Sequence, residues 1–116
     1  MNVNKLIKDT LSPLGLRVVP DKERDGKGEY IAFNYTGESL ENFSDNEPEN
    51  DYTSLQLHYF TPYNPHDIKK KILTLLFKAG FDVSVGAIDH ETETGLYHVP
   101  FDIGIDGVID FNETEE

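Results

Sequence analysis

The chain has 116 residues and a formal net charge of −12 at pH 7, with 22 acidic and 10 basic residues. This composition is typical of one compact domain, which we expect over residues 1–110, followed by a disordered acidic tail over 111–116. The chain contains no cysteine, which excludes a disulfide framework, a cysteine-ligated zinc site and thiol catalysis. Its apolar runs are too short to cross a membrane and its first residues lack a secretory signal, so we expect a soluble, intracellular protein.

The charges are unevenly placed along the sequence. Residues 1–28 carry a net charge of +2 and residues 52–80 carry +3. Acids gather in two stretches without a base, six of them in 37–51 and ten from residue 81 onward. An acidic surface repels phosphate backbones and anionic lipid, so the composition argues against binding to nucleic acid or membranes. Solubility alone explains such a charge in many acidic proteins.

The first half of the chain predicts a helix and two strands. Apolar residues at helical spacing predict a short amphipathic helix over 3–11. A strand over 15–19 follows, and the polar stretch 21–29, with two glycines, predicts a hairpin-like loop. Strict alternation over 30–36 then predicts a strand with one buried face.

The stretch 37–51 has no period and is long for a connection inside a small domain. Connections of this length are usually functional or disordered. Because it combines like charges with Pro48, we expect it to be poorly ordered in an isolated subunit. We expect it to become ordered between subunits, with Leu40 and Phe43 as its apolar anchors.

The second half predicts a strand, a helix and two more strands. Alternation resumes over 52–61, and a helix follows with Asn64 as its N-cap, Pro65 at its first position and Gly80 at its end. Further alternation predicts strands over 81–87 and 97–105, with a turn between them. The expected fold is therefore α+β, a mostly antiparallel sheet of about four to five strands with two helices packed on one face.

Catalytic and metal-binding patterns are weak in this sequence. We find no phosphate-binding loop, no dinucleotide fingerprint, no nucleophile elbow and no zinc-protease motif. His90 and His98 with three nearby acids, Asp89, Glu91 and Glu93, lack the spacing of a defined metal site, and a solvated acidic turn explains them better. We expect no catalytic residue, no metal and no cofactor.

Apolar residues outside the predicted core point to a protein interface. Tyr30 and Phe60 lie on the strand faces opposite the core, while Leu40 and Phe43 interrupt the acidic stretch. His58 shares the outward face of Phe60, where a surface or interface histidine is a better explanation than a general base. These five residues are our candidate oligomer or partner interface.

Several segments, in this order, resemble one family of viral proteins. They are Tyr30-Ile31-Ala32-Phe33-Asn34-Tyr35, Asp45-Asn46-Glu47-Pro48, Leu55-Gln56-Leu57-His58-Tyr59-Phe60, Lys78-Ala79-Gly80-Phe81 and Glu91-Thr92-Glu93-Thr94-Gly95-Leu96-Tyr97-His98. Together with the short N-terminal helix they resemble the tail-completion, or tail-terminator, proteins of long-tailed bacteriophages and prophages, also called minor tail or head-tail joining proteins. The resemblance covers roughly residues 3–105. A basic residue often follows the Tyr-His pair in that family, and Val99 stands there in this chain.

The resemblance implies a structural role without enzymatic activity or a cofactor. It implies an α+β subunit that assembles as a ring, typically a hexamer, on the head-proximal end of the tail tube. There the ring stops tube polymerisation and offers a docking surface to the head-tail connector. The implied locations are the bacterial cytoplasm during assembly and the tail or neck of the virion.

Two other classes of function stay open. One is a different neck or capsid accessory protein of a prophage, which would bind the portal or capsid and not the tail tube. The other is a small host-interaction module whose acidic surface mimics nucleic acid. Capture of a DNA-binding protein by this chain would favour the nucleic-acid mimic.

Overall fold

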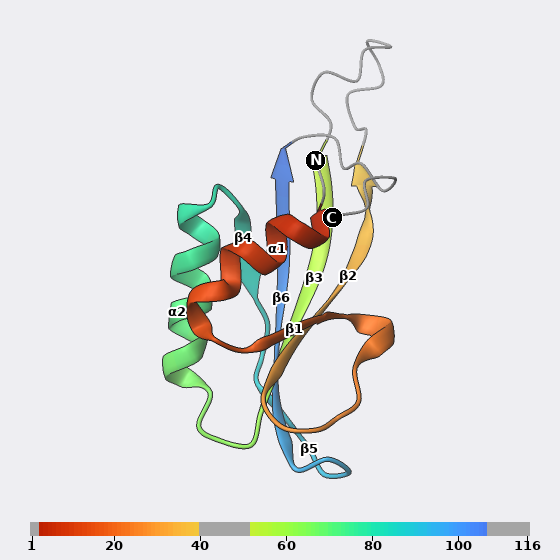
Figure 1. Ribbon diagram of the computed structural model, residues 1–116, viewed down its shortest axis with the longest axis vertical. Coiled ribbons are helices and arrows are strands. Elements are labelled where there is room, and N and C mark those ends of the chain that lie inside the picture. The colour runs from red at the N-terminus through yellow and green to blue at the C-terminus, as the bar shows by residue number, and fades with distance from the viewer. Residues whose placement is uncertain (1–2, 40–51, 107–116) are drawn as a thin grey trace.

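A computed structural model of the chain describes residues 3–39 and 52–106 (Figure 1). In these residues the helices and strands follow one another as α1 (Val3–Leu11), β1 (Arg17–Pro20), β2 (Tyr30–Ser39), β3 (Tyr52–Thr61), α2 (His66–Lys78), β4 (Asp82–Val85), β5 (Asp89–Glu91) and β6 (Leu96–Asp106). Two short 3₁₀ turns, η1 (Ser12–Leu14) and η2 (Asp21–Glu23), flank β1. The fold is α+β, as expected.

The strands of the described residues form one six-stranded mixed sheet. Its order is β1-β2-β3-β6-β4, and β5 pairs with β6 beyond the end of β4. The pairing of β1 with β2 is parallel, and the other pairings are antiparallel. The expectation of a mostly antiparallel sheet is therefore confirmed in outline, whereas the sheet has more strands than expected and is mixed.

Two local features explain these differences. Residues 21–29 are not a hairpin turn, because they carry the chain back so that β2 runs parallel to β1, with Val18 beside Ile31. The strand β5 lies inside the segment expected as a turn, where Asp89–Glu91 pair with Leu96–His98. A strand of three polar residues shows no alternation, so its sequence does not reveal it.

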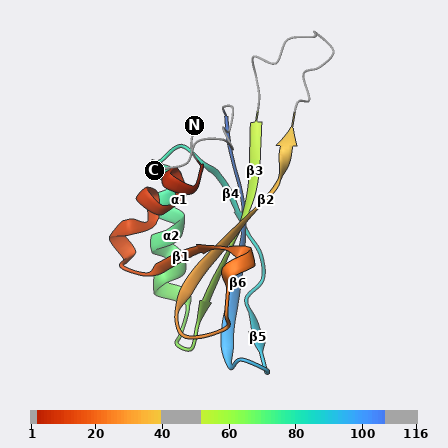
Figure 2. The ribbon, with the colours of Figure 1, turned by 45° about the vertical axis from the view of Figure 1, so that its right-hand side comes forward.

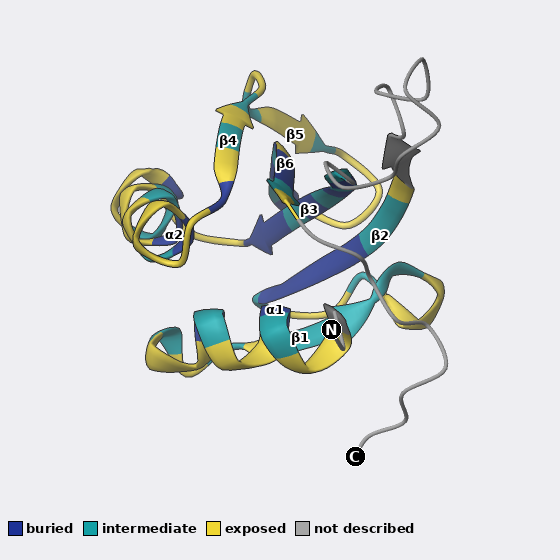
Figure 3. Cartoon of the chain, turned by 90° about the horizontal axis from the view of Figure 1, so that it is seen from above, coloured by how far each residue is buried: buried dark blue, intermediate teal, exposed yellow. Residues whose placement is uncertain are grey.

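Both helices cover the same face of the sheet, as expected (Figure 2). Ile7 and Leu11 of α1 and Ile72 and Leu76 of α2 are fully buried there. The inward side chains of the central strands complete this core, namely Ile31, Phe33, Leu55, Leu57, Tyr59, Val99, Phe101 and Ile103. Figure 3 shows that the outer sides of both helices are exposed, as amphipathic helices require.

The boundaries of α2 follow the capping residues of the sequence. The Asn64 Oδ1 accepts a hydrogen bond from the His66 N–H at 3.0 Å, which satisfies one of the unpaired donors of the first turn. At the other end Gly80 adopts φ +97°, its N–H donates to the Phe77 carbonyl, and the Phe81 N–H donates to the Leu76 carbonyl. This pair of bonds is the Schellman arrangement, which turns the chain directly from α2 into β4.

The strand β2 is longer than predicted. It continues to Ser39, which pairs with Tyr52, and its register shifts between Tyr35 and Gly37. A shift of this kind is a β-bulge, which interrupts the alternation by which a strand is predicted. The predicted connection over 37–51 therefore begins as a strand, and residues 40–51, with Leu40 and Phe43, lie outside the described residues.

Candidate functional site

The face of the sheet opposite the helices carries the candidate interface residues. Tyr30 and Ala32 of β2, Phe60 of β3 and Leu96 of β6 form a second apolar cluster there, with Val19 of β1 packed against it. The register explains this grouping, because Tyr30 lies opposite Phe60, and Phe60 lies opposite His98. The two predicted outward aromatic residues do lie on the face opposite the main core.

These aromatic residues are nevertheless covered. The Arg24 guanidinium lies 5.3 Å from the Phe60 ring centre and that of Arg17 lies 4.7 Å from the Tyr30 ring centre. The Gly26 N–H donates to the Tyr30 hydroxyl at 3.1 Å. As a result Tyr30 and Phe60 are only 1% and 2% exposed. The expectation of an exposed aromatic surface is wrong for this pair, because residues 20–28 fold over it.

An ion pair closes the segment that covers the aromatic pair. Arg17 donates to both carboxylate oxygens of Asp25, at 3.1 and 3.0 Å, and to the Lys27 carbonyl at 2.8 Å. The hydrogen bonds from Arg17 lower the pKa of Asp25 to about 2. Both side chains are exposed to solvent, so the pair fixes the position of the segment more than it adds to stability.

The aromatic stack continues into two histidines. The Phe60 and His98 rings stack with centres 4.8 Å apart, and His98 Nε2 lies 2.8 Å from His58 Nδ1. His58 Nε2 in turn lies 3.2 Å from Asn34 Oδ1, an acceptor, so the proton of neutral His58 belongs on Nε2. His58 Nδ1 then accepts from His98 Nε2–H. His58 is thus a half-buried member of a polar network that spans β2, β3 and β6.

Burial lowers the pKa of both imidazoles by disfavouring their charged form. The pKa values of His58 and His98 are lowered from 6.5, chiefly because burial disfavours the charged form, and His98 lowers that of His58 further. As the pH falls through 6.5, the unfolded chain therefore binds more protons at these two positions than the folded chain does. We expect the free energy of unfolding to fall as the pH decreases from 7.5 to about 5.5.

Urea unfolding at several pH values measures this dependence. The double variant His58→Gln, His98→Gln lacks both imidazoles and is expected to lose most of the decrease between pH 7.5 and 5.5. The variant His66→Gln is the matched control, since His66 is exposed at the start of α2. An equal decrease in the double variant and the parent would contradict a role of the histidine pair.

The other half of this sheet face is open and polar. Gln56 Nε2 donates to Asp102 Oδ1 at 3.0 Å, and the Tyr52 hydroxyl donates to Asp82 Oδ2 at 2.7 Å. The Tyr52 ring lies directly over Gly104, where a Cβ atom would have no room. A shallow hollow of about 380 Å³ is lined by Tyr52, Asp82, Asp102 and Gly104, among other residues. Its hydrogen-bond acceptors come from three strands, β3, β4 and β6, and all of them are open to a partner on this side of the sheet.

The residues considered as metal ligands are spread over the two faces of the sheet. The His90 ring packs against Tyr97, with centres 4.8 Å apart, whereas His98 stacks on Phe60 on the opposite face. Among residues 3–39 and 52–106, no group of three or more histidine or acidic side chains is placed to hold a metal ion.

Metal removal gives a simple prediction. Because the folded core is built from apolar packing, dialysis against EDTA is expected to leave the melting temperature unchanged. Differential scanning fluorimetry measures it, with added zinc and calcium as the reverse test. A fall of several degrees that either ion restores would contradict this expectation.

Sequence reasoning missed part of this surface. The predicted interface omits Asn34 and Gln56, although alternation places them on the same outward face as His58, which it includes. The covering role of Arg17 and Arg24 has no sequence pattern, since it depends on the path of residues 21–29. Leu40 and Phe43 lie outside the described residues.

Comparison with known proteins adds no family to this description. No protein-family model matches the chain, and no curated protein sequence matches it. Neither helix of the described residues is long and apolar enough to cross a membrane.

Proposed function

We propose that the protein is a structural subunit of a phage or prophage tail, which assembles as a ring, typically a hexamer, on the head-proximal end of the tail tube. There it stops tube polymerisation and presents a docking surface to the head-tail connector. The resemblance described above supports this role. The observation on which the assembly depends is a sheet with two different open edges.

The two edges lie on opposite sides of the subunit (Figure 1). On one side β1 pairs only with Tyr30–Phe33, and the described residues place no strand beside Thr36–Ser39 of β2. On the other side β4 ends the sheet, with β6 as its partner. An open edge presents backbone donors and acceptors to another chain. Because the two edges differ, a contact between the edge of one subunit and the other edge of the next is heterologous. Such contacts close into a ring when the rotation from one subunit to the next divides a full turn evenly.

The distinctive segments of the resemblance lie at the turns that lead into β4, an edge strand, and into β6. Ala79, Gly80 and Phe81 form the Schellman end of α2 and set the start of β4, with Phe81 buried in the core. Gly95 adopts φ +74° at the turn into β6. The proposed function needs complementary surfaces and no reactive group.

Disulfide trapping tests the proposed ring. Because the sequence contains no cysteine, any disulfide that forms must join introduced residues. The double variant Thr36→Cys, Ser84→Cys places one thiol on each open edge. Mild oxidation is expected to give a ladder of covalent species that ends at six subunits. Each single variant is the control and is expected to stop at dimers. A double variant that also stops at dimers would contradict edge-to-edge assembly.

Binding assays separate the proposed function from its alternatives. The purified protein is expected to bind tail tubes at one end and to stop their growth in a polymerisation assay. Binding to portal or capsid without binding to tubes would favour another neck or capsid accessory protein. Capture of a DNA-binding protein, without binding to either assembly, would favour a nucleic-acid mimic.

A further inference from the structure

The solvent-facing side of α2 combines a large apolar side chain with positive charge. Phe77 is 77% exposed, one of the most exposed large apolar side chains of the described residues. Lys70 and Thr74 precede it at helical spacing, so the three share one side of the helix. Lys71 and Lys78 flank this line. Aromatic residues are enriched in protein interfaces, and the lysines around Phe77 give this surface a positive charge that attracts an acidic partner.

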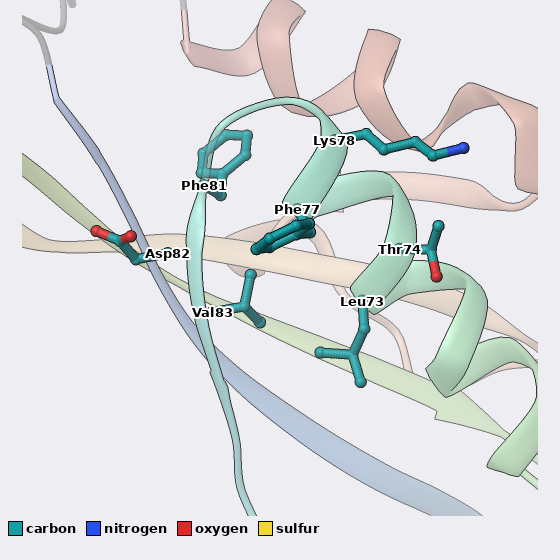
Figure 4. Close-up of a pocket in the computed structure, with 7 residues that line it drawn as sticks. All are labelled: Leu73, Thr74, Phe77, Lys78, Phe81, Asp82 and Val83. Atoms are coloured by element: carbon teal, nitrogen blue, oxygen red, sulfur yellow. The ribbon is translucent and has the colours of Figure 1, made fainter.

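Hollows lie on both sides of this line. One, of about 630 Å³, lies between α2 and β4 and is lined mainly by the apolar side chains of Leu73, Phe77, Phe81 and Val83. Figure 4 shows the Phe77 ring beside Val83, while the Lys78 side chain extends to the other side of the helix. The second, of about 420 Å³, lies between α2 and η1 and is lined by Lys70, Lys71, Leu75 and neighbouring residues. Thr74 lines both hollows, so they adjoin across the helix.

The chemistry of this surface selects its ligand. The apolar hollow accepts large apolar side chains, and the lysines attract carboxylates beside it. The matching ligand is therefore an acidic peptide segment with several large apolar residues. The chain itself contains such a segment after the last strand. Residues 107–116, GVIDFNETEE, carry Val108, Ile109 and Phe111 together with four acids.

The place where this segment begins favours docking within the same chain. Gly104 of β6 pairs with Asp82, which itself lines the apolar hollow. Asp106 follows two residues later, about 7 Å further along the strand. Ten residues reach at most about 33 Å, several times this offset along the strand. The acidic stretch 40–51 is a weaker match, because it joins β2 and β3 on the far side of β6.

We infer that residues 107–116 dock on the α2 surface of their own chain. Ile109 and Phe111 enter the hollow between α2 and β4 and cover Phe77, and the acids lie against Lys70, Lys71 and Lys78. The exposed aromatic residue of α2 is thereby removed from solvent. The docked segment competes with any other acidic partner for the same lysines.

Paramagnetic relaxation tests this contact in the full-length chain. A nitroxide attached through Asn112→Cys is expected to broaden the amide signals of Leu73, Phe77 and Val83. Ionic strength near 1 M reduces the Debye length to about 3 Å and is expected to weaken the broadening. The added variants Lys70→Glu, Lys71→Glu and Lys78→Glu are expected to abolish it. Lys5→Glu with Lys8→Glu on α1 is the matched control and is expected to preserve it.

Three outcomes would overturn the inference. The first is an absence of broadening on α2 and β4, with the nitroxide present. The second is broadening of an isotope-labelled chain by a separate nitroxide-labelled chain, which would assign the contact to a second copy. The third is broadening that survives Ile109→Ser with Phe111→Ser, which would show that the apolar residues do not anchor the segment. None of these outcomes bears on tail-tube capping, which is measured separately.

Discussion

Replacing Phe60 by aspartate is expected to unfold the protein or to destabilise it by at least about 4 kcal/mol. Phe60 is 2% exposed and stacks on Tyr30, with ring centres 4.9 Å apart, and on His98. The variant loses this packing and places a carboxylate in the buried cluster. A typical domain of this size has only about 5–15 kcal/mol of stability in total. Urea unfolding followed by circular dichroism measures the change.

Tyr63→Asp is the matched control for this experiment. Tyr63 is also aromatic and follows β3 closely, but it is 67% exposed. Its replacement is expected to change the free energy of unfolding by no more than about 0.5 kcal/mol. If Phe60→Asp lowered the free energy of unfolding no more than the control does, the burial of Phe60 beneath residues 20–28 would be contradicted. Phe60 would then be an exposed residue, as its sequence position alone predicts.

The substitution Gly104→Ala is expected to cost about 1–3 kcal/mol, although alanine is normally favoured over glycine in a strand. A Cβ atom at this position would overlap with the Tyr52 hydroxyl oxygen and with the ring carbon that bears it. Tyr52 must therefore leave its place over β6, which also breaks its hydrogen bond to Asp82. Thermal or urea unfolding of the variant measures the cost.

A double-mutant cycle isolates the cause of this effect. In a Tyr52→Ala background the methyl group has room, so Gly104→Ala is expected to be neutral within about 0.5 kcal/mol. Equal costs in the two backgrounds would contradict the packing of Tyr52 over Gly104. The same cycle reports on the open polar half of the sheet, where this pair lines the hollow.

Local patterns predicted most of the helices and strands. Alternation identified β3 with its correct ends, and it assigned Leu55, Leu57 and Tyr59 to the buried face. Asn64 and Gly80 marked the ends of α2 because capping is decided by neighbours in sequence. These features depend on contacts within a few residues, so a single sequence contains the information.

Features that depend on distant contacts were not predicted. The course of residues 21–29 follows from bonds such as Arg17 with Asp25 and from the packing of Arg24 on Phe60. No local pattern distinguishes this course from a hairpin loop. Likewise, His58 and His98 are 40 positions apart in sequence, and only the strand register brings their rings together. Alternation therefore assigned these side chains to the correct face of the sheet, but it could not show which segments cover that face.

The covered aromatic cluster changes where a partner can bind. Tyr30 and Phe60 are buried within the subunit, so in the proposed ring we expect the assembly contacts at the sheet edges and at the open polar half near Gln56 and Asp102. The side of α2 that carries Phe77 and the lysines is a separate, positively charged surface, the proposed docking site of residues 107–116. The buried aromatic cluster and the expected contact surfaces therefore use different residues. Variants can change the stability of the subunit and its assembly separately.

The most direct measurement of the proposed function is the length and joining of tails made without this protein. Removing its gene from the phage or prophage is expected to give filled heads unjoined to tails, with tails overlong or ragged at the head-proximal end. Supplying the protein from a plasmid is expected to restore tail length and infectivity. Infectious particles with tails of normal length, made in its absence, would contradict the proposal that the protein ends tail growth.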